Sequence, residues 1–194
     1  MSADLAARLR QRADPSRVPG LQRFFKTGPG EYAEGDVFIG VTVPDLRRVC
    51  RECRGATIPD ILVLLGSAVH EERLLALLLL VETFRRGTDE TKREIYRLYL
   101  ANTKFINNWD LVDSSAPHIV GAWLFTRSRA PLRRLARSSS LWERRIAIIA
   151  TQFFIRNGDL EETFRIADLL LLDRHDLIHK AVGWMLRGAG KRKP

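Results

Sequence analysis

The sequence predicts an all-α protein built from stacked helical hairpins. Apolar residues recur at every third or fourth position along almost the whole chain, as amphipathic helices require, and no stretch alternates as strands do. The second helices of successive pairs also align at a spacing of about 35 residues, which is typical of two-helix solenoid repeats. An ordinary bundle of helical hairpins is the alternative, and in that case the alignment is a coincidence.

Turn-forming residues delimit the expected elements. A helix over Asp4–Ala13 ends where Asp14 and Pro15 interrupt the pattern, and a second helix covers Leu21–Lys26. An ordered loop is expected over Thr27–Val43, because this segment holds four glycines and Pro29. It does not match a phosphate-binding loop, because no Gly-Lys-Ser/Thr follows and no strand precedes. The remaining expected helices are Pro44–Arg54, Ile58–Gly66, His70–Arg86, Asp89–Thr103, Asn108–Thr126, Pro131–Arg137, Leu141–Arg156, Leu160–Leu172 and His175–Arg187.

Size and charge indicate one domain with a polyanionic partner. With 194 residues, of which 45% are hydrophobic, the chain can bury a full core as a single domain over residues 1–194. The net charge is +9, and 26 Arg stand against 6 Lys. Arginine binds phosphate through paired hydrogen bonds, so this excess favours a polyanion, although a basic protein without such a partner is an alternative. The N-terminal residues lack a signal-peptide apolar region, and the longest apolar run, Leu74–Val81, is too short to span a bilayer. We therefore expect a cytoplasmic protein without membrane contact.

Two pairs of potential metal ligands do not predict a metal site. Cys50 and Cys53 form one C-x-x-C without the second pair that would complete four zinc ligands, so two reduced thiols are expected. His175 and His179 are four residues apart, but they do not match H-E-x-x-H and have no apparent third ligand. We expect no metal and no cofactor. A metal hydrolase that uses these histidines is kept as an alternative.

The segment from Lys104 to Asp113 gathers several reactive groups at helical spacing. Asn107 or Asn108 can cap a helix start, and Trp109 and Asp113 then lie one turn apart on the same face. An indole beside a lone carboxylate is suited to holding a positive centre. The alternative is a buried indole, with the acid satisfying a neighbouring helix end.

Alignment of the repeats extends this face to other helices. The third position of the aligned helices reads Leu74, Trp109, Arg145 and Lys180, and the seventh reads Leu78, Asp113, Ile149 and Trp184. Equivalent positions of stacked repeats point the same way, so these polar and aromatic residues are expected on one concave wall.

Other arginines and Trp123 have less specific interpretations. Trp123 lies in an apolar run and is expected in the core. Two groups of arginines are either phosphate-binding ridges or solvated faces: Arg47, Arg48, Arg51 and Arg54, and Arg127, Arg129, Arg133, Arg134 and Arg137.

Five segments together resemble a known family over almost the whole chain. They are Phe24-Phe25-Lys26, Phe38-Ile39-Gly40-Val41, Trp109-Asp110-Leu111-Val112-Asp113, Trp142-Glu143-Arg144-Arg145 and Lys180-Ala181-Val182-Gly183-Trp184. The chain resembles the AlkD-type DNA alkylation repair glycosylases. That resemblance implies a right-handed α-solenoid of HEAT-like helical hairpin repeats with a concave basic groove. The family usually continues with further helices, so its last helices are expected to be missing here.

The resemblance also implies a function and a set of site residues. It places the catalytic carboxylate at Asp113 and the catalytic indoles at Trp109 and Trp184. It places DNA contacts at Arg145 and Phe25, and we add Arg144 and Lys180 from the same motifs. The implied reaction is hydrolysis of the N-glycosidic bond of N3- and N7-alkylated purines in duplex DNA, by a monomer associated with the bacterial nucleoid. The alternative is a non-catalytic helical-repeat scaffold that binds DNA or protein.

Overall fold

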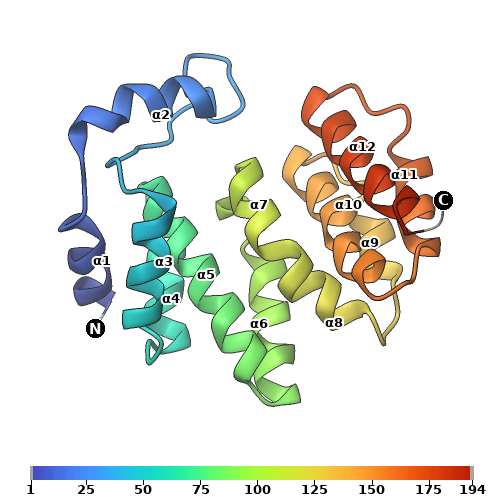
Figure 1. The fold of residues 1–194 in the computed structure, drawn as a ribbon, viewed down its shortest axis with the longest axis horizontal. Helices are drawn as coiled ribbons and strands as arrows, with labels where there is room; N and C mark the ends of the chain where they lie inside the picture. The colour runs from blue at the N-terminus through green and yellow to red at the C-terminus, as the bar shows by residue number, and fades with distance from the viewer. Residues whose placement is uncertain (1, 193–194) are drawn as a thin grey trace. The chain divides into compact units, whose positions relative to one another are not determined.

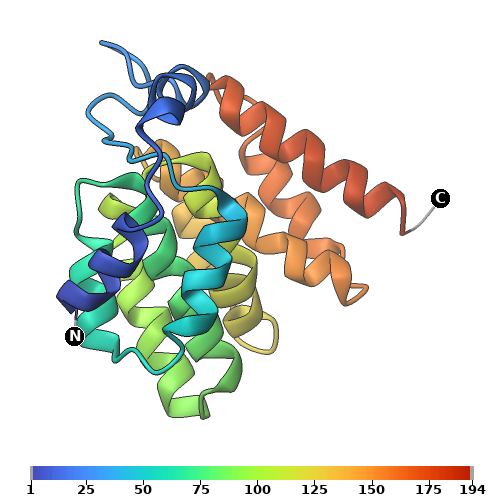
Figure 2. The same ribbon diagram turned by 60° about the vertical axis from the view of Figure 1, so that its left-hand side comes forward.

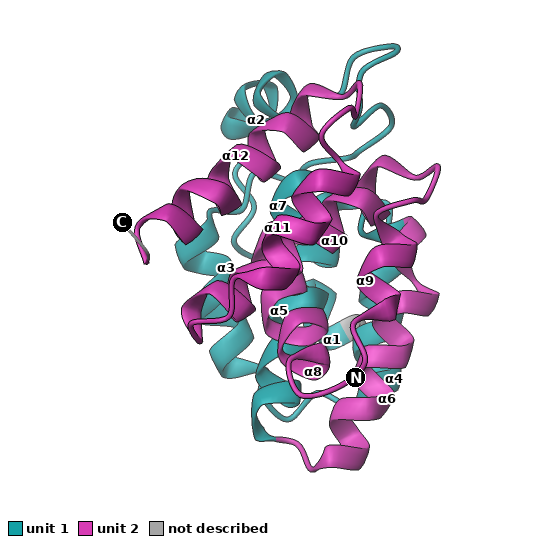
Figure 3. Cartoon of the chain, turned by 90° about the vertical axis from the view of Figure 1, so that its right-hand side faces the viewer, with its two compact units in different colours: residues 1–86, 105–111 teal, residues 87–104, 112–194 magenta. Residues whose placement is uncertain are grey.

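The computed structural model describes residues 2–192 and confirms the all-α prediction, because its described residues form helices and no strand (Figure 1). These residues divide into two compact units (Figure 3). The first comprises residues up to Arg86 together with 105–111, and the second comprises 87–104 together with residues from Val112 onward. The single domain, the right-handed sense and the concave groove stay predictions.

In the first unit, two short sequence repeats set the starts of two helices. Its helices are α1 (Ser2–Arg10), α2 (Val18–Phe25), α3 (Val43–Glu52), α4 (Ile58–Leu65) and α5 (His70–Arg86). Thr42 caps α3 by accepting the N–H of Asp45, and Thr57 caps α4 by accepting the N–H of Asp60. Each cap belongs to a Thr-x-Pro-Asp sequence, in which proline occupies the first turn, where no hydrogen bond is lost. The α3 and α4 helices pack on α5.

The loop between α2 and α3 is ordered by a buried acid on α5. The Glu71 carboxylate accepts the N–H groups of Ile39, Gly40 and Val41, at 3.1, 2.8 and 3.3 Å. Gly40 has φ +84°, and a Cβ there would lie 2.0 Å from the carbonyl oxygen of Asp14. The loop therefore depends on a glycine at this position.

The second unit is organised around α10. Its helices are α6 (Asp89–Ala101), the end of α7 (Trp109–Ala116), α8 (Ala122–Leu124), α9 (Ala130–Leu135), α10 (Leu141–Arg156), α11 (Glu161–Leu169) and α12 (Asp176–Gly190). The α10 helix contacts α9, α11 and α12, and it lies beside α12 in both ribbon views (Figure 1, Figure 2). Residues 146–150 of α10 are fully buried, which is why this segment has no polar face.

Several expected helices differ from the structure at their ends, such as Asp4–Ala13, which ends at Arg10, and Leu160–Leu172, which ends at Leu169. Two further differences have a clear physical cause. The helix expected from Leu21 begins at Val18, because Pro19 lies in its first turn, where proline is tolerated. The helix expected over Asn108–Thr126 contains a π-turn at Pro117–Gly121 between α7 and α8. Pro117 has no N–H for a regular helix, and Gly121 meets α10 so closely that a Cβ would lie 2.2 Å from the carbonyl oxygen of Ala150.

Candidate active site

Asp113 and Arg145 form a two-pronged ion pair in the second unit. Arg145 Nε and Nη2 donate to Asp113 Oδ1 and Oδ2 at 2.9 and 2.8 Å, and Nη1 donates to the carbonyl oxygen of Leu177 at 2.5 Å. The Arg145 side chain is 6% exposed, whereas that of Asp113 is 17% exposed. The buried guanidinium therefore holds both oxygens of a carboxylate whose side chain is partly exposed. DNA contact by Arg145 stays a prediction, and the structure gives this residue a positioning contact instead.

The α12 helix presents the second predicted indole. Trp184 is 43% exposed, an unusual state for so large an apolar side chain. Its neighbour Lys180 is exposed and pairs with Asp176 at 2.6 Å. Arg144 is more constrained, because it binds Asp173 at 2.6 Å and the carbonyl oxygens of Ser138 and Ser139. An exposed indole and an exposed ammonium group paired with Asp176 thus lie on α12, whereas the Arg144 guanidinium is bound to three partners.

In the first unit, Trp109 belongs to a stack of aromatic rings. Phe25 stacks on Trp109 with centroids 5.3 Å apart and on Phe38 with centroids 5.1 Å apart. Phe24 meets Trp109 edge-on at 5.7 Å. Phe25 is 8% exposed, whereas Phe24 is 62% exposed. DNA contact by Phe25 stays a prediction, but Phe24 is the phenylalanine that the structure leaves accessible beside Trp109.

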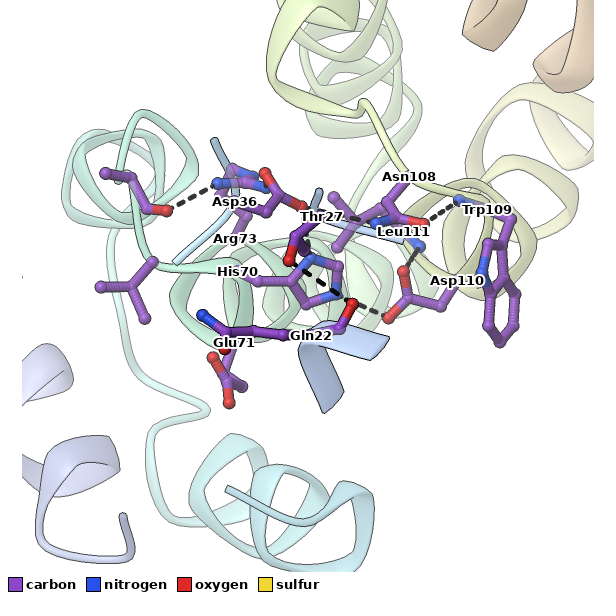
Figure 4. Close-up of polar contacts among 12 residues, drawn as sticks. Gln22, Thr27, Asp36, His70, Glu71, Arg73, Asn108, Trp109, Asp110 and Leu111 are labelled. Atoms are coloured by element: carbon purple, nitrogen blue, oxygen red, sulfur yellow. Dashed lines mark hydrogen bonds and ion pairs between the residues drawn. The ribbon is translucent and has the colours of Figure 1, made fainter. Parts of the chain in front are cut away.

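A buried histidine links the start of α7 to α5 and to the loop (Figure 4). His70 Nδ1 lies 3.0 Å from Asp36 Oδ2, and Nε2 lies 2.8 Å from Asp110 Oδ2. Asp36 also accepts from Arg73 Nη2 at 2.6 Å and from Asn108 Nδ2 at 3.4 Å. Burial opposes the imidazolium, but hydrogen bonds with Asp110 and Asp36 outweigh it and raise the pKa of His70 to about 9. Desolvation opposes ionisation of Asp36 too, yet its bonds to His70 and Arg73 lower its pKa.

Side-chain hydrogen bonds also order the first turn of α7. The Asn108 side chain accepts the N–H of Trp109 at 2.8 Å, and Asp110 Oδ1 accepts the N–H of Leu111 at 2.9 Å. Leu111 and Val112 occupy the adjoining face of α7 and are fully buried. Trp109 and Asp113 are therefore one turn apart on a helix whose first turn is fixed by its own polar side chains.

Sequence reasoning missed several members of these clusters, namely Phe24, Asp36, His70, Arg73 and Asp110. Asp110 directly follows Trp109 in the same motif, and this position could have indicated a role near Trp109. His70 stands at a helix start beside Glu71 and Glu72, a position where a buried cation is not expected from sequence.

Most arginines near α9 pair with acids. Arg127 binds Asp89 at 2.8 Å, and Arg133 binds Glu162 at 2.9 Å. The Arg127 guanidinium also lies 3.6 Å from the centroid of Trp123, which is 8% exposed and thus buried, as expected. By contrast, Arg47, Arg48 and Arg51 on α3 are exposed. The three arginines of α3 are therefore more accessible to a polyanion than Arg127 and Arg133, which are paired with acids.

The cysteine and histidine pairs lie apart from these clusters. Cys50 and Cys53 are buried free thiols, and desolvation raises the pKa of Cys50 to about 11. His175 caps α12 by accepting the N–H of Leu177, and His179 contacts the carbonyl oxygen of Asp173. Among residues 2–192, no cluster of three or more His, Cys, Asp or Glu side chains is arranged to hold a metal ion.

None of the helices in that range has the length and hydropathy needed to cross a bilayer.

Two comparisons with known proteins give the fold and the family, respectively. A structure described as "Predicted DNA alkylation repair enzyme from Enterococcus faecalis" is similar, with a TM-score of 0.68 at 16% sequence identity over 94% of this chain and 85% of that one. At this identity the similarity establishes the fold alone. No curated protein matches the chain. The model of the family described as DNA alkylation repair enzyme matches residues 5–194. The chain belongs to the DNA alkylation repair enzyme family.

Proposed function

We propose that the protein is a DNA glycosylase that removes positively charged N3- and N7-alkylated purines, such as 3-methyladenine and 7-methylguanine, from duplex DNA. The observation that carries this proposal is the Asp113 carboxylate, which is held at both oxygens by Arg145 and still keeps 17% of its side chain exposed. A fixed, ionised carboxylate that is not fully buried suits the stabilisation of a cationic sugar.

The chemistry of the proposed substrate requires only one carboxylate. Alkylation of a ring nitrogen makes the purine cationic, so the base departs as a neutral molecule without protonation by a general acid. The electron pair of the glycosidic bond moves to the base, and positive charge develops on the deoxyribose. Asp113 stabilises that charge and orients the water whose oxygen bonds to the sugar carbon, with its proton released to solvent or to the carboxylate. Arg145 contributes by fixing the direction of the carboxylate.

The two indoles have a matching role in the proposal. The ring faces of Trp109 and Trp184 stabilise the cationic sugar, each by about 0.5–2 kcal/mol. Lys180 and Phe24 are the accessible cationic and aromatic side chains next to them, and we assign to them contacts with the phosphate backbone and the bases. Arg144 and Phe25 already have protein partners, each within its own unit.

A non-catalytic DNA-binding scaffold is the second candidate, and one observation favours it. Arg145 satisfies both oxygens of Asp113, so this pair could serve packing alone. A scaffold would bind DNA through the same basic surface but would release no base.

The deciding experiment is incubation of the protein with methylated duplex DNA, followed by chromatography for free 7-methylguanine and 3-methyladenine. Base release by the parent protein and a loss of at least about 100-fold in Asp113→Asn are expected. Asp168→Asn is the matched control, because Asp168 is an exposed acid on α11. Equal release by Asp113→Asn and the parent would refute the role of Asp113. Binding without release by the parent would favour the scaffold.

A further inference from the structure

The strongest unassigned cluster is the buried histidine between two carboxylates in the first unit. His70 is 1% exposed, and its ring lies between Asp36 and Asp110 (Figure 4). A neutral imidazole has a single N–H and can donate to only one of these acids. Its other nitrogen would then face a carboxylate oxygen at about 3 Å with no hydrogen between them. The geometry therefore favours an imidazolium, in which each nitrogen donates to one carboxylate.

The same ring also supports the aromatic stack beneath Trp109. Its centroid is 4.9 Å from that of Phe25 and 4.6 Å from that of Phe38. Phe25 in turn stacks on Trp109. His70 thus reaches Trp109 by two routes, one through the hydrogen bond to Asp110 at the first turn of α7 and one through the ring of Phe25.

We propose that His70, as an imidazolium, is the positioning residue for Trp109. It holds Asp110 at the start of α7 and contacts Phe25, which stacks on the indole. Arg73 binds the other oxygen of Asp36. Loss of one proton from His70 would place two acceptors opposite each other and release either Asp110 or the loop at Asp36. The role in base release rests on the proposed function, whereas the positioning of Trp109 does not.

The charged groups around His70 come from three segments. Asp36 belongs to the loop, Asp110 to α7, and Arg73 to α5 itself. The carboxylate of the adjacent Glu71 is turned toward the N–H groups of residues 39–41. Two acids and one shared arginine thus surround the imidazolium, and the hydrogen bonds raise the pKa of His70 to about 9.

The first test uses free protein and needs no substrate. The fluorescence of Trp109 is obtained between pH 7 and 10 as the difference between the parent and Trp109→Phe, and the imidazole is followed by NMR. A change in Trp109 emission with a midpoint near pH 9 is expected, together with titration of the His70 ring at the same midpoint. Asp110→Asn should abolish this change in emission, because a neutral imidazole can donate to Asp36 and accept from the new amide. A flat profile in the parent, or the same midpoint in Asp110→Asn, would overturn the proposal.

The second test measures base release at pH 7.5. His70→Gln has one donor nitrogen in place of two and should lower the rate by about tenfold or more through displacement of Trp109. The exposed control His179→Gln should match the parent. Unchanged release by His70→Gln would contradict the positioning role. If the parent itself releases no base, the proposed function fails, and the fluorescence and NMR data alone decide the role of His70. If His70→Gln does not fold, the emission profile of Asp110→Asn in the first test decides the role of His70.

Discussion

Arg145 donates to both carboxylate oxygens of Asp113, at 2.9 and 2.8 Å, and its third contact is with the Leu177 carbonyl oxygen near the start of α12. One side chain thus fixes the candidate catalytic acid and ties it to the helix that carries Trp184. This geometry makes Arg145 as informative to mutate as Asp113.

Arg145→Lys should separate charge from geometry. Lysine keeps the positive charge but cannot bind both oxygens in parallel, so base release should fall at least about tenfold and the free energy of unfolding by about 1–3 kcal/mol. A double-mutant cycle with Asp113→Asn should give a coupling energy of about 0.5–3 kcal/mol in chemical denaturation. Arg165→Lys, in an exposed pair with Glu161, is the control and should change stability by less than about 0.5 kcal/mol. If the stability losses of the two single variants simply add in the double variant, the Arg145–Asp113 pair does not stabilise the fold.

The exposed and buried tryptophans should respond in opposite ways to truncation. Trp184→Ala should reduce base release strongly and cost less than about 1 kcal/mol of stability, because the indole is 43% exposed. Trp123→Ala removes a side chain that is 8% exposed and should cost about 3–5 kcal/mol. Denaturation and single-turnover assays on both variants check this. A large loss of stability in Trp184→Ala would point to a packing role.

Stability should decline in mild alkali. The pKa of His70 is about 9 in the folded protein, compared with 6.5 for an unperturbed histidine, so the folded state binds the proton more tightly. The corresponding stabilisation is complete below pH 6.5 and is lost as the pH rises through 9, with a total on the order of 3 kcal/mol. Urea denaturation at several pH values measures the slope. His70→Gln should remove this component, and an equal slope in both proteins would disprove the assignment.

Thiol reagents should react slowly with the native protein. Burial raises the pKa of Cys50 to about 11 and also raises that of Cys53, so little thiolate exists at pH 7.5. Labelling with a chromogenic disulfide should be much slower than in urea. Fast labelling of native protein would show that the region around α3 opens.

Chelators should leave base release unchanged. The proposed reaction needs no metal, because the leaving base is already cationic and Asp113 acts directly on the sugar. Activity measured after dialysis against EDTA should equal that of untreated protein. A loss that zinc or magnesium restores would revive the metal-hydrolase alternative with His175 and His179.

The helical fold could be predicted from sequence, whereas the contacts of the site could not. Helix positions follow from apolar periodicity and from local caps such as Thr42 and Thr57, which act over three residues. The alignment of repeats suggested a common direction for Asp113 and Arg145, but it gave no sign that they bind each other. The bond depends on how α7 and α10 pack, and spacing along the chain does not encode that.

The choice between Phe24 and Phe25 shows the same limit. Both belong to the motif, and which ring is buried depends on the face of α2 that packs on the rest of the unit, where Phe25 contacts Phe38 and His70. The His70 network was missed for a related reason, since Asp36, His70 and Asp110 are far apart in sequence and meet only after folding.

Gly121 limits how this region can diversify. A single methyl group at this position would collide with the main chain of α10 at Ala150 and with the Cβ of Phe153. Any larger residue would wedge the two segments apart and tilt the helix on which Arg145 sits. Variant libraries that test the proposed function should therefore leave position 121 fixed and vary the accessible side chains at positions 24, 180 and 184.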